Sequence, residues 1–398
     1  MTHLSLRRLL PAFFSGLLLL PLTGCALAPL IPSFSPSWTS PPAATRQPAS
    51  HSDAPRAETP DRYAWSLLTA SDEQDLYLRI CAAVADMAPT LVVTGFDSDT
   101  LVRILDYVRI DYPEYFWFNG ADSLSTRTIG GVVQDITVNL SYNMTADQLP
   151  QAKAAVEDAA QDCLSAIDSS WSDYDKIKAV YDWVIRRADY DGSVTDQSLY
   201  SVMTQGRGVC AGYARATQYL LQSLDIPCTY ITGYARGGSH AWNLVEADGE
   251  DYYLDPTWGD PVFTDGSSGD PNQVSYGYFC VTTDVLLRTH TIDDTLPVPQ
   301  CTATSCNYYV HNGLSFSDYD LQALTEPLIQ TAQSGAASFS FQFTNADAYA
   351  QAVSSLFNGQ EVFSLLDQAA SSTALDASKV RYSTDDTLWV VTIRLQYR

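Results

Sequence analysis

The chain has 398 residues and a formal net charge of −24, from 46 acidic and 22 basic side chains. This length is sufficient for two or three domains with well-buried cores. So acidic a surface repels the phosphate backbone of nucleic acids and anionic lipid headgroups. The charge therefore argues against nucleic-acid partners and against membrane docking through a basic patch.

The chain begins with a basic pair, a short apolar stretch and a cysteine. Arg7 and Arg8 precede the apolar residues 9–20, and Leu22-Thr23-Gly24-Cys25 follows. The stretch is too short to span a bilayer comfortably. Residues 1–24 resemble a bacterial lipoprotein signal, which implies cleavage before Cys25 and lipidation of its thiol. An ordinary secretory signal or an uncleaved anchor is the alternative.

A proline-rich stretch follows the predicted lipidation site. Residues 26–60 contain eight prolines among Ser, Ala and Thr. This composition cannot bury a core and favours extended polyproline conformations. Residues 25–60 are therefore interpreted as a tether that holds the folded part outside the cytosol, at a bacterial cell membrane.

Residues 61–168 are predicted to form an α+β module with no evident chemistry. Apolar side chains at helical spacing (Leu76, Ile80 and Val84) predict one helix. Further elements are expected within the same module. The predicted elements are helices at Ser71–Ala88, Thr100–Val108 and Ala146–Ile167, and a strand at Val132–Tyr142.

Residues 169–300 and 301–398 are predicted as two further modules. In the central one, Asp248-Gly249 between two apolar runs indicates a β-hairpin. Its predicted helices are Asp175–Arg187, Ser198–Thr204 and Cys210–Leu224, and its strands are Cys228–Gly233, His240–Glu246 and Asp251–Asp255. The last module is predicted as a small α/β unit with a structural or docking role. It is expected to contain strands Ser338–Phe343 and Leu388–Leu395 around a helix at Ala346–Leu356.

Eight cysteines are present, and Cys25 and Cys210 have roles proposed here. The other six permit up to three disulfides in an exported protein, and the sequence does not choose among the 15 pairings. No Cys-X-X-Cys pair is present and histidines are few, so no metal site is expected. The six are Cys81, Cys163, Cys228, Cys280, Cys301 and Cys306.

Cys210 follows Gly206-Arg207-Gly208 and opens a predicted helix. The N–H groups at a helix N-terminus stabilise a thiolate and can hold a developing oxyanion. Neighbouring glycines let a substrate approach the backbone closely. Taken alone, a cysteine at this position is as often a buried apolar residue or half of a disulfide.

His240 and Asp255 lie on the two strands of the predicted hairpin. With a two-residue turn at Asp248-Gly249, residue numbers of cross-strand partners sum to 497, so Asp255 faces Trp242. Alternation then places His240 and Asp255 on one side as diagonal neighbours, where a carboxylate can orient an imidazole. A slip of one residue would put them on opposite faces.

Three segments carry a resemblance to a known family. Gly208-Val209-Cys210-Ala211-Gly212-Tyr213-Ala214, His240-Ala241-Trp242-Asn243 and Leu254-Asp255-Pro256-Thr257-Trp258-Gly259-Asp260 resemble the cysteine, histidine and aspartate motifs of the transglutaminase-like superfamily. Their order and spacing, 30 and then 15 residues, also fit. The resemblance covers about residues 170–262. It implies a papain-like α+β core, with the cysteine helix packed on an antiparallel sheet, and Cys210, His240 and Asp255 as catalytic residues.

The other parts of the predicted site are less defined. The backbone N–H of Cys210 is one predicted oxyanion donor, and Gln205 is a weak second candidate. Tyr174, Tyr200 and Trp242 are further candidates, each with packing as the alternative. Trp242 and Trp258 are predicted to form the core or the wall of a cleft. His290 and His311 lie outside the motifs and are expected at the surface.

The resemblance implies a thiol acyl-transfer enzyme that acts on amides through a thioester on Cys210. Hydrolysis of peptide or cell-wall amides is favoured over cross-linking, on the breadth of the family alone. No cofactor is expected, because acidic clusters at calcium-loop spacing are absent from the sequence. The alternative is a non-catalytic surface protein that binds peptide or cell-wall material on the same scaffold.

Overall fold

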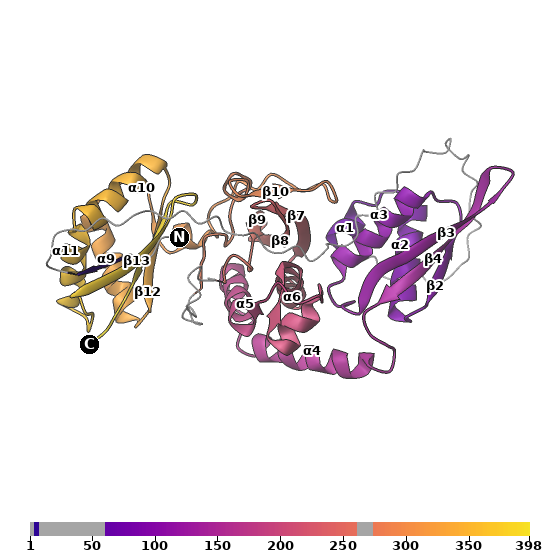
Figure 1. The fold of residues 1–398 in the computed structure, drawn as a ribbon, viewed down its shortest axis with the longest axis horizontal. Coiled ribbons are helices and arrows are strands. Elements are labelled where there is room, and N and C mark those ends of the chain that lie inside the picture. The colour runs from indigo at the N-terminus through magenta and orange to yellow at the C-terminus, as the bar shows by residue number, and fades with distance from the viewer. Residues whose placement is uncertain (1–3, 8–59, 261–273) are drawn as a thin grey trace.

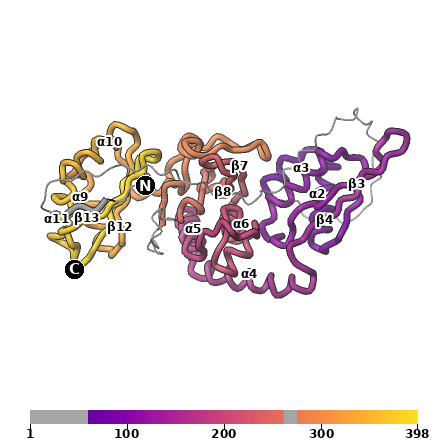
Figure 2. Tube along the Cα trace, viewed as in Figure 1, coloured from indigo at the N-terminus to yellow at the C-terminus, as the bar shows by residue number. Residues whose placement is uncertain are grey.

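The computed structural model describes residues 4–7, 60–260 and 274–398, and their mixed helices and sheets confirm the predicted α+β class. Three groups of elements follow one another along the longest axis of the molecule (Figures 1 and 2). Cys25, most of the predicted signal and the tether up to residue 59 lie outside the described residues.

The first group packs helices on a three-stranded antiparallel sheet with the order β2-β4-β3. Its long β3–β4 hairpin projects away from the rest of the molecule (Figure 1). Strand β3 was not predicted, because most of its side chains are polar or exposed and show no apolar alternation. The elements are α1 (Tyr63–Ser66), α2 (Ser71–Ala85), β2 (Thr90–Val93), α3 (Ser98–Asp111), β3 (Phe118–Ile129) and β4 (Val132–Tyr142).

The central group places helix α6 against an antiparallel sheet with the order β10-β7-β8-β9. Helix α4, predicted with the first module, packs its apolar side chains into the same core as α5 and α6. In Figure 1 it runs along the lower edge of this group. The elements are α4 (Leu149–Leu164), α5 (Asp173–Arg187), α6 (Cys210–Gln222), β7 (Cys228–Ala235), β8 (Gly238–Ala247), β9 (Glu250–Leu254), α7 (Thr283–Leu286) and β10 (His290–Ile292).

A short π-helical segment, η1 (Ser201–Gln205), lies against the start of α6. Gly206 then turns the chain with φ +69°, and β6 (Arg207–Gly208) pairs with β5 (Asp189–Tyr190). A Cβ atom on Gly208 would lie 2.4 Å from Val202 Cγ2 of η1. The prediction that this glycine admits substrate is therefore wrong, because its missing side chain makes room for η1.

The C-terminal group is a five-stranded sheet, order β1-β13-β14-β12-β11, with helices beside it. The predicted strand Leu388–Leu395 is shorter than expected, because residues 386–389 form the turn from β13 and Trp389 has φ +57°. The elements are α8 (Tyr308–His311), β11 (Ser315–Phe316), α9 (Leu321–Gln333), β12 (Ser338–Phe343), α10 (Ala346–Val353), η2 (Ser354–Asn358), α11 (Glu361–Ala370), β13 (Lys379–Asp385) and β14 (Val390–Arg394).

Strand β1 (Leu4–Arg7) lies within residues 1–24, which were predicted as a signal and not as part of a folded module. It pairs antiparallel with residues 379–382 of β13 and so forms part of the C-terminal sheet. Without β1, strand β13 would be an edge strand, and edge strands present unpaired N–H and C=O groups that readily bind another strand.

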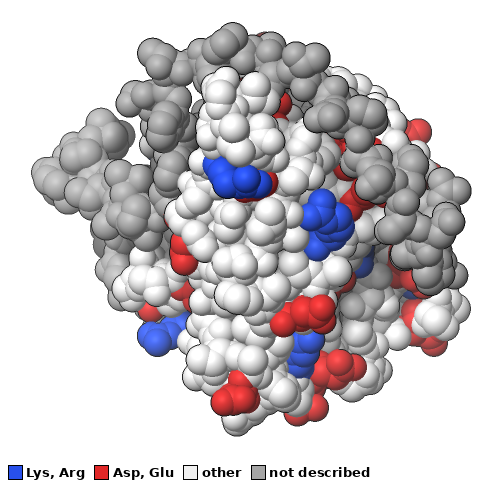
Figure 3. Space-filling view, turned by 90° about the vertical axis from the view of Figure 1, so that its right-hand side faces the viewer, with Lys and Arg blue, Asp and Glu red and all other residues white. Residues whose placement is uncertain are grey.

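Two properties bear on contact with membranes, the distribution of surface charge and the length of apolar helices. On the face shown in Figure 3, acidic and basic side chains are scattered among uncharged ones, so the acidic excess is not gathered there. Among residues 4–7, 60–260 and 274–398, no helix combines the length and apolar character needed to cross a bilayer.

The packing of η1 on α6 predicts the effect of one substitution. We expect Gly208→Ala to lower the free energy of unfolding by about 1–3 kcal/mol, because the new methyl group overlaps Val202. Gly192→Ala is the matched control, since no atom lies within 4 Å of a Cβ there. Urea unfolding measures both variants. Equal stability of the two, or no recovery of Gly208→Ala by Val202→Ala, would contradict the assignment.

Candidate active site

Cys210 is the first residue of α6, and Val209 before it is extended. All seven described cysteines are free thiols, so the disulfides that the sequence permitted are not formed among them. Cys210 is partly exposed, whereas the other six are buried. Burial raises the pKa of Cys163 to about 12 and, with Asp251, that of Cys301 to about 11. Cys210 is therefore the thiol in the described chain that a reagent in solution can reach.

The β8–β9 hairpin has the predicted register. Pairs run from Asn243 with Leu254 to Ala247 with Glu250. The two-residue turn is possible because Asp248 and Gly249 both have positive φ, +53° and +78°. This register brings His240 and Asp255 together, with His240 Nε2 2.7 Å from Asp255 Oδ2. The geometry predicted from the hairpin is thus confirmed.

The Asp255 carboxylate is fully buried and accepts four hydrogen bonds. Its Oδ1 accepts from the backbone N–H of Thr257 at 2.9 Å and of Trp258 at 3.2 Å. Its Oδ2 lies within hydrogen-bond distance of two imidazoles, those of His240 and His290. Burial raises the pKa of Asp255, but the two histidines outweigh it and hold that pKa well below the ordinary range.

His240 connects the carboxylate to the thiol. Its Nε2 contacts Asp255, and Cys210 lies close enough to its ring to act on the pKa of the imidazole. Burial lowers the pKa of His240, but the charge and hydrogen bond of Asp255, followed by those of Cys210, raise it to about 10. At neutral pH the ring is therefore a cation close to Cys210.

The pKa shifts of Asp255 and His240 determine the pH range in which this pair stabilises the fold. A carboxyl group with a lowered pKa stabilises the folded state above its unfolded value, near pH 4, and loses this as pH falls. An imidazole with a raised pKa stabilises it fully below about pH 6.5 and loses this as pH rises through about 10. The contribution of His240 and Asp255 is therefore largest between about pH 4 and pH 6.5.

His290 was expected at the surface, and this is wrong. It begins β10 and is buried, with Nε2 3.1 Å from Asp255 Oδ2. The chain returns here because β10 pairs with β7, which places His290 opposite Ala235. No motif indicated His290, since the carboxylate that it meets, Asp255, is 35 residues away in sequence. His311 is exposed as expected, and its ring stacks on Tyr174 with centroids 3.5 Å apart.

The two predicted wall tryptophans have different places. Trp242 is fully buried, so it is a core residue beneath the site and does not line a cleft. Trp258 is partly exposed, and its ring centroid lies 5.8 Å from that of His240 and 4.7 Å from that of His290. The Arg236 guanidinium lies over its ring, 4.6 Å from the centroid. Trp258 thus borders the catalytic groups where they approach the surface.

The further oxyanion candidates do not join the triad. Gln205 is exposed at the end of η1, and no hydrogen bond in the described chain links it to Cys210. Tyr174 accepts a hydrogen bond from Asn312, and Tyr200 stacks on Phe116, so both have packing roles. The role of Gln205 as a second oxyanion donor stays a prediction.

One group among the described residues has the composition of a metal site. His240, Asp255 and His290 each offer a ligand atom, and these atoms lie within 4.8 Å of one another. The same atoms are already joined by hydrogen bonds of 2.7 and 3.1 Å. These bonds satisfy the buried carboxylate, so its charge is compensated by the two imidazoles.

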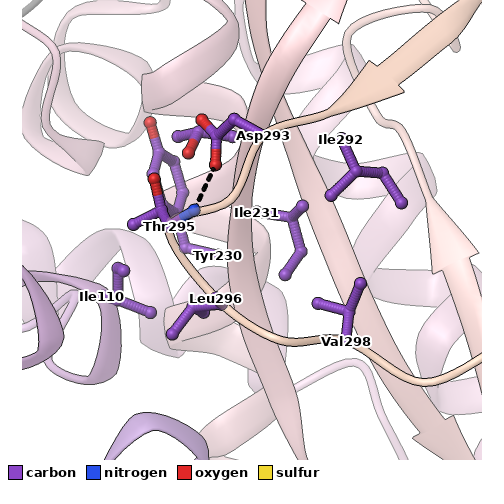
Figure 4. A pocket seen from close by; sticks show the side chains of 9 residues that line it. Ile110, Tyr230, Ile231, Ile292, Asp293, Thr295, Leu296 and Val298 are labelled. Carbon is purple, nitrogen blue, oxygen red and sulfur yellow. Dashed lines mark hydrogen bonds between the residues drawn. The ribbon is translucent and has the colours of Figure 1, made fainter.

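A small pocket borders β7, the strand that pairs with β8 (Figure 4). Strand β7, the end of α3 and the segment after β10 supply its walls, and Ile231, Ile292 and Val298 point into it. It does not contain the triad, but Tyr230 lines it, and the charge of Cys210 acts on Tyr230.

The part of the chain that carries this site matches one known family. Residues 163–256 match the family model of the transglutaminase-like superfamily, a span that includes Cys210, His240 and Asp255. No curated protein matches the sequence.

Three solved structures are similar to parts of the chain. A TGase shares 16% identity with a TM-score of 0.26, over 46% of this chain and 53% of that one. A candidate cysteine protease from Cytophaga hutchinsonii shares 19% identity, TM-score 0.23, over 34% and 61%. A candidate protease from Parabacteroides distasonis shares 11% identity, TM-score 0.21, over 33% and 35%. The chain thus spans between about a third and three-fifths of the length of these proteins.

Of the two groups that raise the pKa of His240, Asp255 contributes more, through its charge, and Asp255→Asn tests this. Burial then dominates, so we expect the pKa of His240 to fall from about 10 to below its ordinary value of about 6.5. Titration of the imidazole nitrogens by NMR measures the change, with the exposed His311 ring as internal control. A His240 pKa that stays near 10 in the variant would show that another group holds the proton.

Proposed function

Because this chain contains a transglutaminase-like domain, we propose that it is a cysteine enzyme that transfers acyl groups from amides. Cys210 is the nucleophile, His240 the general acid and base, and Asp255 the group that orients His240. One observation carries the proposal. Asp255 is hydrogen-bonded to His240, and the partly exposed Cys210 acts on the His240 ring, so that the three groups join a helix N-terminus to two strands of a hairpin.

The first half of the reaction forms a thioester. The Cys210 thiolate attacks the amide carbonyl, so that a carbon–sulfur bond forms and the carbon–oxygen π electrons move to oxygen. The carbon–nitrogen bond then breaks, and the imidazolium of His240 gives its proton to the leaving amine. Asp255 stabilises the imidazolium before this transfer and fixes the tautomer after it.

The second half releases the acyl group. A nucleophile attacks the thioester carbonyl while neutral His240 takes its proton, and the carbon–sulfur bond breaks to restore the thiolate. Water gives a carboxylic acid, and an amine gives a new amide. The first turn of α6 provides N–H groups without helical partners for the oxyanion of both steps, with the N–H of Cys210 the nearest to the sulfur.

We favour hydrolysis over cross-linking as the outcome. Cys210 is partly exposed, so water has access to a thioester formed there. An acceptor amine needs a binding site of its own, whereas water does not. The substrates that we propose are peptide or cell-wall amides. A location outside the cytosol, with the protein held at a bacterial membrane by lipid on Cys25, is also a proposal, based on residues 1–25.

The reactivity of Cys210 separates an enzyme from a binding protein on the same scaffold. We expect iodoacetamide at neutral pH to modify Cys210 faster than it modifies a free cysteine, because the imidazolium of His240 stabilises the thiolate. His240→Ala should slow this roughly a hundredfold, and His311→Ala should not. Mass spectrometry of modified peptides gives the rates, and the buried thiols serve as slow references. Modification of Cys210 at the rate of free cysteine would favour the non-catalytic reading.

The fate of the acyl group separates hydrolysis from cross-linking. We expect a glutamine-containing peptide, offered with excess primary amine, to yield glutamate and free ammonia with little amine conjugate. Cys210→Ser is the control for background deamidation. Mass spectrometry distinguishes the products, and a conjugate that exceeds the acid would assign the protein as a cross-linker. A parallel incubation with peptidoglycan fragments tests cell-wall amides.

A further inference from the structure

Asp255 has a second imidazole that the proposed reaction does not use. His290 Nε2 lies 3.1 Å from the same oxygen, Oδ2, that contacts His240. The His290 side chain and the carboxylate are both fully buried, so water does not compete for this contact. An ionised carboxylate accepts only, and the Nε2 atom of His290 must therefore carry the hydrogen for the contact to be favourable.

The other nitrogen of His290 is prepared for that tautomer. Its Nδ1 lies 2.9 Å from Thr289 Oγ1 and, at a longer 3.3 Å, from the carbonyl oxygen of Leu286. Thr289 Oγ1 in turn lies 2.5 Å from the hydroxyl of Tyr278. With the phenol donating to Thr289 and Thr289 donating to Nδ1, each group has one hydrogen for the next. The series then ends with His290 Nε2–H donating to Asp255. In this order the shorter contact of Nδ1 is one in which it accepts from Thr289, and the hydrogen of the ring is on Nε2, where Asp255 accepts it.

We propose that His290 is a positioning residue of the site, which holds Asp255 ionised and with Oδ2 directed at His240. It acts through Asp255 and touches neither Cys210 nor substrate. The inference rests on the proposed function, because the purpose of orienting Asp255 is to keep the imidazolium of His240 beside the thiolate. Tyr278 and Thr289 have the subordinate role of fixing the tautomer of His290.

The alternative to positioning is packing. The His290 ring lies among Trp242, Trp258, Tyr278 and His240, with centroid separations between 4.7 and 5.4 Å. Few charged or titratable groups surround the His290 ring. Asp255 and His240 face it directly, while Arg236 and Asp385 act on Tyr278 next to it. A flat ring in this cluster would contribute apolar contacts even without a hydrogen bond.

Two substitutions separate these roles, because each keeps one property of His290 and removes the other. His290→Phe keeps an aromatic ring of similar size and loses the N–H. His290→Gln keeps an N–H donor and loses the ring. The readout is the rate constant for alkylation of Cys210 by iodoacetamide between pH 4 and pH 10, in the full chain, with near-UV circular dichroism as the check on folding.

If His290 positions Asp255, His290→Phe should slow alkylation at neutral pH roughly tenfold. The acid limb of the pH profile of alkylation should move to higher pH in this variant, because an Asp255 carboxylate with one donor fewer is protonated more easily. His290→Gln should react within about threefold of the wild type. The reverse order, with the Phe variant at the wild-type rate and the Gln variant slow, would overturn the proposal in favour of packing.

A measurement on the unmodified protein covers the case in which either variant does not fold. The imidazole nitrogen shifts of wild-type His290 report which nitrogen carries hydrogen. Hydrogen on Nε2 is expected, and an unprotonated Nε2 would overturn the proposal. The two hypotheses fail separately. Alkylation of wild-type Cys210 at the rate of a free thiol refutes the proposed function, whereas the tautomer of His290 is independent of that rate.

Discussion

The structure of the site depends on one buried negative charge. A carboxylate taken out of water costs several kcal/mol unless charges and hydrogen bonds compensate it. Asp255 is fully buried, so all four of its lone-pair positions need donors from the protein. Two backbone N–H groups that follow it and two imidazoles supply them. This requirement links the end of β9 to β8 and to β10, which the chain reaches only after a further 35 residues.

The ionised carboxylate of Asp255 determines the charge of His240, which lies between it and Cys210. Because Asp255 stays ionised, His240 keeps its proton well above neutral pH, and the cation lies beside the sulfur of Cys210. The other thiols in the described chain are buried among apolar residues, where the neutral thiol is favoured. One cysteine among seven is therefore both accessible and paired with a cation. This selectivity arises from the arrangement of charge and burial, since all seven thiols are chemically alike.

The sequence revealed those parts of the site that depend on local rules. The Asp248-Gly249 turn determines the register of β8 and β9, and the register determines that His240 meets Asp255. For elements with strong apolar periodicity, such as α5 and β12, the predicted bounds lie close to the observed ones. His290 and the polar strand β3 were missed, because β10 lies far along the chain and β3 lacks apolar alternation. The role of Gly208 was mistaken, since only the tertiary packing of Val202 shows what fills the space beside it.

The position of the nucleophile depends on contacts along the whole of α6. Near its start, Gly208 and Gly212 allow η1 to approach closely. In its middle, Asn243 of β8 donates to the carbonyl of Ala214, so the helix is bonded to the strand that carries His240. On another side, Arg215 and Gln218 donate to carbonyl groups of Arg109 and Ile110 at the end of α3. The first group of elements therefore holds α6 by direct bonds to its side chains. Cys210 and His240 keep their separation because one helix is attached at once to the sheet behind it and to the module beside it.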